Sequence, residues 1–208
     1  MGFKTPEQSQ IMIRKVVAPA MLSPNKTLFG GYIMSWIDEV AFMSARRYSG
    51  QATVVTANID NISFLYPIKE GEQVILTARV NYVGRSSMEI GVRVEIEDAF
   101  SGKLTHTNSA YLTFVALDSR AKPVSVPKLM LETEEDQRRY EEAKLRVKIR
   151  MRLRRHLKSK LKISNTTRKL LQKPPTAFIN PVAVYKDYVY KISHRLKDQL
   201  EKINRGLF

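Results

Sequence analysis

The chain contains no cysteine and only three histidines, His106, His156 and His194, which lie far apart in the sequence. The absence of cysteine excludes disulfide scaffolds, thiolate nucleophiles and cysteine-ligated zinc. The spread of the histidines argues against a helical two-histidine metal site. No apolar run approaches the roughly eighteen residues that a membrane-spanning helix needs. The polar first ten residues do not resemble a secretory signal, so we expect a cytoplasmic protein.

Acidic residues are scarce only in the last third of the chain. Over all 208 residues the net charge is +15, from 35 Lys+Arg and 20 Asp+Glu. Residues 1–140 hold 16 Lys+Arg and 15 Asp+Glu (16 − 15 = +1), whereas residues 141–208 hold 19 and 5 (19 − 5 = +14). This asymmetry predicts a domain at 1–140 and a basic helical C-terminal extension at 141–208.

The pattern of apolar residues predicts a strand, a helix and then four strands. The helix begins at Gly30-Gly31 and is apolar on almost every side, which is typical of a buried helix. Apolar and polar residues alternate with period two in the later strands, which indicates an antiparallel sheet with one covered face. The expected strands span residues 7–17, 53–65, 73–83, 87–97 and 104–117. A long sheet with a single buried helix must wrap around that helix.

Basic helices are expected after this sheet. Thr133 is a candidate cap, and acidic residues follow it in the first turn of a helix that runs to about Ile163. No acid occurs from Lys144 to Lys173. Residues 183–204 carry apolar side chains three and four positions apart, which predicts an amphipathic helix.

Asp38 is the unusual residue of the apolar helix. A carboxylate among apolar groups costs several kcal/mol unless it is paired, and its pKa tends to rise. A raised pKa suits a general base or a nucleophile. A carboxylate bonded to the backbone of a loop is an equally good interpretation of the sequence. Gly31 precedes Asp38 by two helical turns, or roughly 10 Å, on nearly the same face.

Gly30-Gly31 leaves backbone N–H groups open at the start of the helix. Such groups can stabilise an oxyanion or polarise a carbonyl. Tight packing of the helix against the sheet would explain the two glycines equally well.

Several motifs in order resemble the acyl-CoA thioesterases of the hotdog fold. The first is Thr27-Leu28-Phe29-Gly30-Gly31, followed by Met34-Ser35-Trp36-Ile37-Asp38-Glu39-Val40-Ala41. Further matching stretches are 64–68 with Gly71, 84–88, 116–118 with 122–124, and 132–140. The resemblance covers roughly residues 8–150, and the set of motifs is specific although no single motif is.

The resemblance implies an α+β fold, a five-stranded antiparallel sheet wrapped round a central helix. It also implies homodimers with active sites at the dimer interface, often assembled further as trimers of dimers. The implied reaction is hydrolysis of acyl-CoA to a free fatty acid and coenzyme A, with no metal or cofactor. The family's catalytic aspartate falls on Asp38.

The resemblance assigns further site residues and also shows a departure. The family's second catalytic residue is an asparagine six positions before the phenylalanine, where this chain has Ser23; Asn25 lies two residues on. Backbone N–H groups near Gly30-Gly31 would stabilise the oxyanion. The turn containing Arg85, Ser86 and Ser87 would contact coenzyme A, with Arg85 beside its phosphates.

The sequence leaves other functions open. The chain could be a non-catalytic acyl-CoA sensor, which Ser23 favours slightly, with the basic extension as its effector arm. The basic stretch 144–173 could bind nucleic acid or an anionic membrane, or it could be a solvated helix at the rim of the oligomer. It has no interleaved aromatic residues for base stacking. A hotdog dehydratase is disfavoured because no histidine lies on the central helix.

Overall fold

The computed structural model describes residues 2–51, 53–60, 62 and 66–160. The amphipathic helix expected at 183–204, and the basic stretch beyond residue 160, lie outside the described residues. In the part that is described, no helix is long and apolar enough to cross a membrane.

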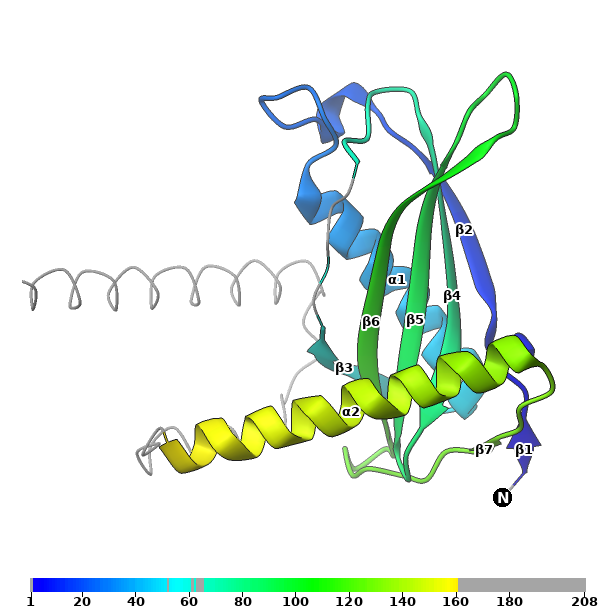
Figure 1. The fold of residues 1–208 in the computed structure, drawn as a ribbon, viewed down its shortest axis with the longest axis vertical. Helices are drawn as coiled ribbons and strands as arrows, with labels where there is room; N and C mark the ends of the chain where they lie inside the picture. The colour runs from blue at the N-terminus through cyan, green and yellow to red at the C-terminus, as the bar shows by residue number, and fades with distance from the viewer. Residues whose placement is uncertain (1, 52, 61, 63–65, 161–208) are drawn as a thin grey trace, which may run out of the picture. The chain divides into compact units, whose positions relative to one another are not determined.

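A single five-stranded antiparallel sheet forms the body of the fold, in the order β2-β4-β5-β6-β3 (Figure 1). Its strands are β2 (Ile11–Val16), β3 (Thr53–Ile59), β4 (Gln73–Val83), β5 (Ser87–Glu97) and β6 (Leu104–Leu117). The three long strands end where the alternation of apolar and polar residues predicted. Two expected strands are shorter than predicted, because residues 7–9 form a 3-10 helix and β3 ends before Asp60.

Helix α1 (Gly30–Ser49) packs against the concave face of this sheet, which confirms the predicted hotdog fold. It ends at Gly50, whose left-handed backbone (φ 67°) allows its N–H to bond the carbonyl of Arg46. The prediction that the helix is buried on every side is wrong for the single chain. The sheet covers the face with Trp36, Ile37 and Val40, whereas Ser35, Glu39 and Phe42 stay exposed.

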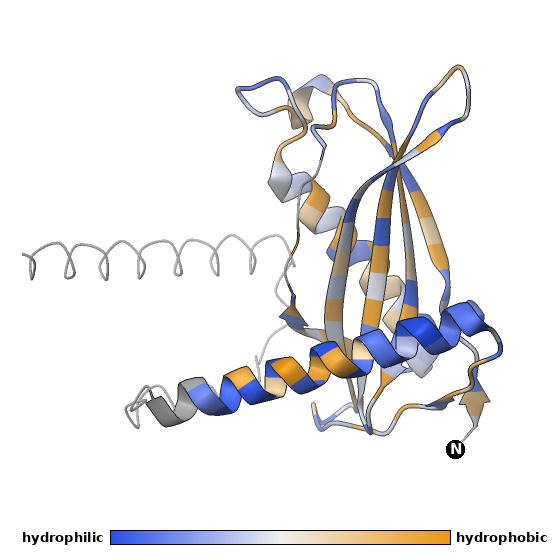
Figure 2. Cartoon of the chain, viewed as in Figure 1, coloured by the Kyte–Doolittle hydropathy of each residue, from blue (hydrophilic) through white to orange (hydrophobic). Residues whose placement is uncertain are grey.

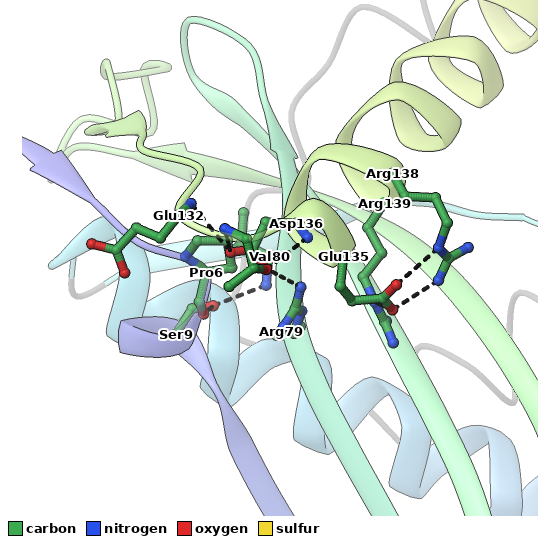
Figure 3. Close-up of polar contacts among 10 residues, drawn as sticks. Pro6, Ser9, Arg79, Val80, Glu132, Glu135, Asp136, Arg138 and Arg139 are labelled. Carbon is green, nitrogen blue, oxygen red and sulfur yellow. Dashed lines mark hydrogen bonds and ion pairs between the residues drawn. The ribbon is translucent and has the colours of Figure 1, made fainter.

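Short elements complete the edges of the fold. Strands β1 (Phe3–Lys4) and β7 (Lys128–Leu129) form a two-stranded parallel pair that the sequence did not predict. Two 3-10 helices, η1 (Glu7–Ser9) and η2 (Pro19–Met21), flank β2. In η1 the buried Ser9 hydroxyl accepts a hydrogen bond from the Val80 N–H, so η1 is fixed to β4 (Figure 3).

Helix α2 (Glu134–Lys160) lies on the outer face of the sheet, opposite α1 (Figure 1). Thr133 caps it as predicted, since its hydroxyl accepts a hydrogen bond from the Asp136 N–H at 3.1 Å. Near its start, Asp136 pairs with Arg79 of β4 at 2.5 Å (Figure 3). The helix runs without a break past residue 140, where the change in charge balance predicted a domain boundary.

Candidate functional site

Asp38 lies on α1 and is held by a threonine from the edge strand β3. The hydroxyl of Thr56 donates a hydrogen bond to Asp38 Oδ1 at 2.9 Å. Thr56 pairs across the sheet with the fully buried Phe114, so its side chain is on the concave face, toward α1. This hydrogen bond therefore links α1 to strand β3 through the Asp38 carboxylate.

The surroundings of Asp38 favour its protonated form more than water would. Burial raises the pKa of the Asp38 carboxyl above its usual value, and the hydrogen bond from Thr56 lowers the pKa by a smaller amount. Because burial is the larger effect, the net direction is upward. A carboxylate in this state accepts a proton more readily than one in water, as a general base must.

Thr56 was not predicted as a site residue from the sequence. The run Thr53–Ile59 reads only as a strand rich in Val and Thr. A weak signal was available, because period two places Thr56 on the same face as the buried Val54. Thr56 is nevertheless exposed, so the strand pattern alone does not demand a partner for its hydroxyl, and only the fold shows that this partner is Asp38.

The start of α1 shows both features by which the sequence could explain Gly30-Gly31, namely open N–H groups and tight packing. Phe29 precedes the helix, and among the described residues no side chain caps the first N–H groups. The Phe29 ring lies so close to Gly31 that a Cβ there would sit 2.4 Å from a ring carbon. A side chain at position 31 would therefore force the Phe29 ring, which is 56% exposed, to move aside.

Ser23 and Asn25 lie in a tight loop that leads into α1. The Ser23 N–H bonds the Thr27 carbonyl at 2.7 Å, and the two hydroxyls are 3.2 Å apart. Asn25 is exposed at the tip of this loop. The Phe29 N–H bonds the Met21 carbonyl, which fixes the loop beside the start of the helix. Among the described residues the Ser23 hydroxyl contacts Thr27 and the Asp38 carboxylate contacts Thr56, and no hydrogen bond joins Ser23 to Asp38.

The Gly84–Ser87 stretch forms the turn between β4 and β5. The Gly84 N–H bonds the Ser87 carbonyl at 2.8 Å, and the Arg85 side chain is exposed. The Arg85 carbonyl accepts from Val126, and the neighbouring Pro127 carbonyl accepts from the hydroxyl of Tyr48, near the end of α1. The turn therefore lies near the C-terminal end of α1.

The turn and the start of α1 lie at opposite ends of β4. The Leu28 N–H bonds the carbonyl of Ile68, shortly before β4 begins, whereas the turn follows the last residue of β4. Eleven strand residues span about 36 Å. One chain therefore does not bring Arg85 together with Gly30-Gly31, and a shared site needs the turn of another copy.

A cavity of about 130 Å³ lies elsewhere, between α2 and the outer face of the sheet. Its lining includes Asn81, Arg93, Tyr111 and Arg146. These residues lie on the face of the sheet away from α1, so the cavity is separate from Asp38.

Comparison with known proteins places this arrangement in a family. Residues 25–99 match the model of the thioesterase superfamily. The chain is 42% identical over 138 residues to the uncharacterized acyl-CoA thioester hydrolase YkhA of Bacillus subtilis, covering 64% of this chain and 80% of YkhA. The chain belongs to the thioesterase superfamily, and within it to the group of acyl-CoA thioester hydrolases.

Solved structures agree with this assignment. An acyl-CoA hydrolase from Staphylococcus aureus, in complex with butyryl coenzyme A and coenzyme A, superposes with a TM-score of 0.70 at 37% identity, covering 82% of this chain and 99% of that one. Variants of that enzyme with an aspartate, an asparagine or a threonine changed to alanine have also been solved. A hexameric acyl-CoA thioesterase superposes with a TM-score of 0.70 at 34% identity, covering 73% and 97% of the two chains.

Proposed function

We propose that the chain hydrolyses acyl-CoA thioesters to a free fatty acid and coenzyme A, with Asp38 as general base or nucleophile. The observation that carries this proposal is the half-buried Asp38 on α1, hydrogen-bonded to Thr56 and with a raised pKa. The Staphylococcus aureus enzyme supports it, since the variants made there include an aspartate and a threonine.

As a general base, Asp38 takes a proton from a water molecule as the water oxygen attacks the thioester carbonyl. The tetrahedral intermediate collapses, the C–S bond breaks, and the proton passes from Asp38 to the departing thiolate. As a nucleophile, Asp38 would instead attack the thioester carbonyl and expel the coenzyme A thiolate, which forms an anhydride. Water then cleaves the anhydride, which frees the fatty acid and Asp38 and supplies the proton that the thiolate takes up. In both routes Thr56 donates to Oδ1 and orients the carboxylate. Neither a metal nor a cofactor enters the proposal.

The open N–H groups at the start of α1 are the proposed oxyanion donors. Gly30 and Gly31 lie in the first turn, where backbone N–H groups have no partner within the helix. The seven residues between Gly31 and Asp38 span about 10 Å, so both groups reach one thioester only if the substrate lies along the helix. Otherwise the two groups serve sites on different subunits.

A homodimer that pairs through β3 is the proposed assembly unit, and higher assembly to a trimer of dimers is part of the proposal. Both β2 and β3 are edges of the sheet. The β2 edge carries Arg14 and Lys15, charges that discourage strand pairing, whereas Thr53–Ile59 contains no charged residue. The hexameric neighbour supports this proposal. Such a dimer would bring a second Ser23 loop and a second Arg85 turn toward the site.

The basic helix is the proposed contact for a polyanion. Residues 144–160 contain no acid, and their described side chains include exposed Lys148, Arg152 and Arg155. Nucleic acid and an anionic membrane are the two candidates. A cytoplasmic location completes the proposal, and cell fractionation tests it.

Replacing Asp38 with asparagine tests the proposed function. Asp38→Asn keeps the shape and the contact with Thr56 but cannot accept a proton from water. We expect kcat for an acyl-CoA series to fall about 10²- to 10⁴-fold, with the melting temperature and the oligomeric state unchanged. The assay follows the release of coenzyme A with a thiol reagent. Turnover within a few-fold of the unmodified enzyme would remove Asp38 from the mechanism.

A non-catalytic acyl-CoA sensor is the second candidate, because Ser23 stands where the family has asparagine. The same acyl-CoA series separates the two candidates. Saturable binding of acyl-CoA without release of thiol, in the unmodified protein, would favour the sensor.

A further inference from the structure

Helix α2 crosses the outer face of the sheet from β4 to the edge strand β3. Its ion pairs show which strands it crosses. Asp136 contacts Arg79 on β4, and Arg146 Nη2 contacts Glu89 Oε1 on β5 at 2.8 Å. Arg150 contacts Asp60, directly after β3, at 2.7 Å. Arg150 therefore stands at the edge of the sheet.

The helix continues past this edge. We call residues 151–160 the overhang. Ten helical residues span about 15 Å, and neighbouring strands are about 4.8 Å apart, so the overhang is about three strands long. Figure 1 shows it projecting beyond β3, and Figure 2 shows that this half of α2 carries apolar as well as polar residues.

One side of α2 faces the sheet, and the same side continues along the overhang. Ala143 is fully buried there, and Arg146 and Arg150 make their ion pairs on the same side. Residues three and four apart share a face, so Leu153 extends this side beyond the edge. Leu153 is 56% exposed. An apolar side chain thus continues a buried face at a position where the sheet of this chain has ended.

A second copy of the chain fits this position because of the edge beneath it. β3 is the uncharged edge of the sheet, and a strand pairing with it would extend the sheet under the overhang. Two identical edges related by a twofold axis pair antiparallel, so the end of one β3 lies beside the start of the other. At that start, Val55 pairs with Val115 on the outer face, and both are half-buried.

We propose that the overhang of each α2 lies on the outer face of the sheet of a second copy, with Leu153 against Val55 and Val115 of that copy. The contact is reciprocal, so each subunit covers the other. The inference rests on the homodimer of the proposed function, and adds a helix–sheet contact to the strand pairing.

A photo-cross-linker at single cysteines tests this contact, since the chain has no cysteine of its own. Leu153→Cys and Arg152→Cys are labelled with benzophenone maleimide in the full-length protein. Arg152 is the matched control, because two residues beyond Arg150 turn the helix by about 200°, away from the sheet. After irradiation, denaturing gels separate products of one and two chain masses.

We expect the label at 153 to give several-fold more two-chain product than the label at 152, with cross-links mapping to residues 53–55 or 113–117. Equal yields, or cross-links from 153 to residues 161–208 of the same chain, would overturn the inference. So would cross-linking to added phosphatidylserine vesicles in place of a second copy. Light scattering on the unlabelled variants tests the overhang contact and the homodimer separately. An oligomer that gives no two-chain product overturns the overhang contact alone, whereas a monomer overturns the homodimer as well.

Discussion

Removing the hydroxyl of Thr56 should weaken catalysis without weakening the fold. Thr56→Val keeps the β-branched shape that suits a strand and deletes the donor that lies 2.9 Å from Asp38 Oδ1. A hydrogen bond to a charged group is worth about 1.5 kcal/mol at the lower end of its range, which suits an exposed threonine. If the bond acts fully in the transition state, kcat/KM falls about tenfold.

The same substitution should also change the pH dependence, in a direction that the structure fixes. The bond from Thr56 lowers the pKa of Asp38, and burial raises it by more. Without the bond only burial remains, so the pKa rises further. Because the base must be deprotonated, the acid limb of the kcat/KM profile moves to higher pH in Thr56→Val.

Coenzyme A release, measured with a thiol reagent across the acid side of neutrality, tests both effects. Thr53→Val is the control, because it makes the same change in the same strand, three residues away from Thr56. It should leave the profile unchanged. In an Asp38→Asn background, Thr56→Val should cost nothing further. A Thr56→Val enzyme with the activity and the acid limb of the unmodified one would refute the assignment of Thr56.

The remaining predictions concern the loop, the extension and the outer face. Ser23→Asn, which restores the family's residue in a short loop, should keep or raise kcat; loss of activity would mean that Ser23 itself is used. Truncation after Ser164 should leave a soluble, active enzyme, and the full-length chain should bind heparin more weakly as salt rises; insolubility of the truncated chain, or no heparin retention at low salt, contradicts this. Arg146→Met leaves the 1%-exposed Glu89 without its cation and should cost about 3 kcal/mol of unfolding free energy at neutral pH. Burial raises the pKa of Glu89, so its protonated form is favoured in the fold and stability declines as pH rises through that pKa; urea unfolding should therefore show a smaller loss for Arg146→Met in mild acid, and an equal loss at both pH values would contradict the role of Glu89.

The sequence predicted the elements that depend on local patterns. Period two located β4, β5 and β6, and Thr133 marked the start of α2 because capping is a local interaction. The pairing of β1 with β7 was missed, since each has only two residues and neither carries a pattern. The exposed side of α1 was missed because composition does not tell how far a sheet wraps.

The site was predicted in part for the same reason. Asp38 stands out as a carboxylate in an apolar helix, which the chain order alone reveals. Its partner Thr56 lies 18 residues later on another element, and only the fold brings the two together. The distance between the Arg85 turn and the start of α1 likewise follows from the direction of β4. All the residues predicted to act in the site stay predictions in that role: Ser23, Asn25, Gly30, Gly31, Asp38, Arg85, Ser86 and Ser87.

The ion pairs between α2 and the sheet restrict where the helix can lie along its own axis. Along α2 the pairing residues are one acid, Asp136, and then two arginines, Arg146 and Arg150. The sheet offers them one cation and then two anions, so each charge on the helix faces a charge of opposite sign. Sliding α2 by one turn, about 5.4 Å, would break the Asp136–Arg79 pair in either direction. In one direction Glu142 would replace Arg146 opposite the buried Glu89; in the other, Arg150 and Arg154 would replace Arg146 and Arg150, so Asp136 alone opposes that slip. Purely apolar contacts would tolerate such a slip. The ion pairs thus help to fix the position of α2 along the sheet more than they add to the stability of the fold, and in evolution the two members of a pair must change together.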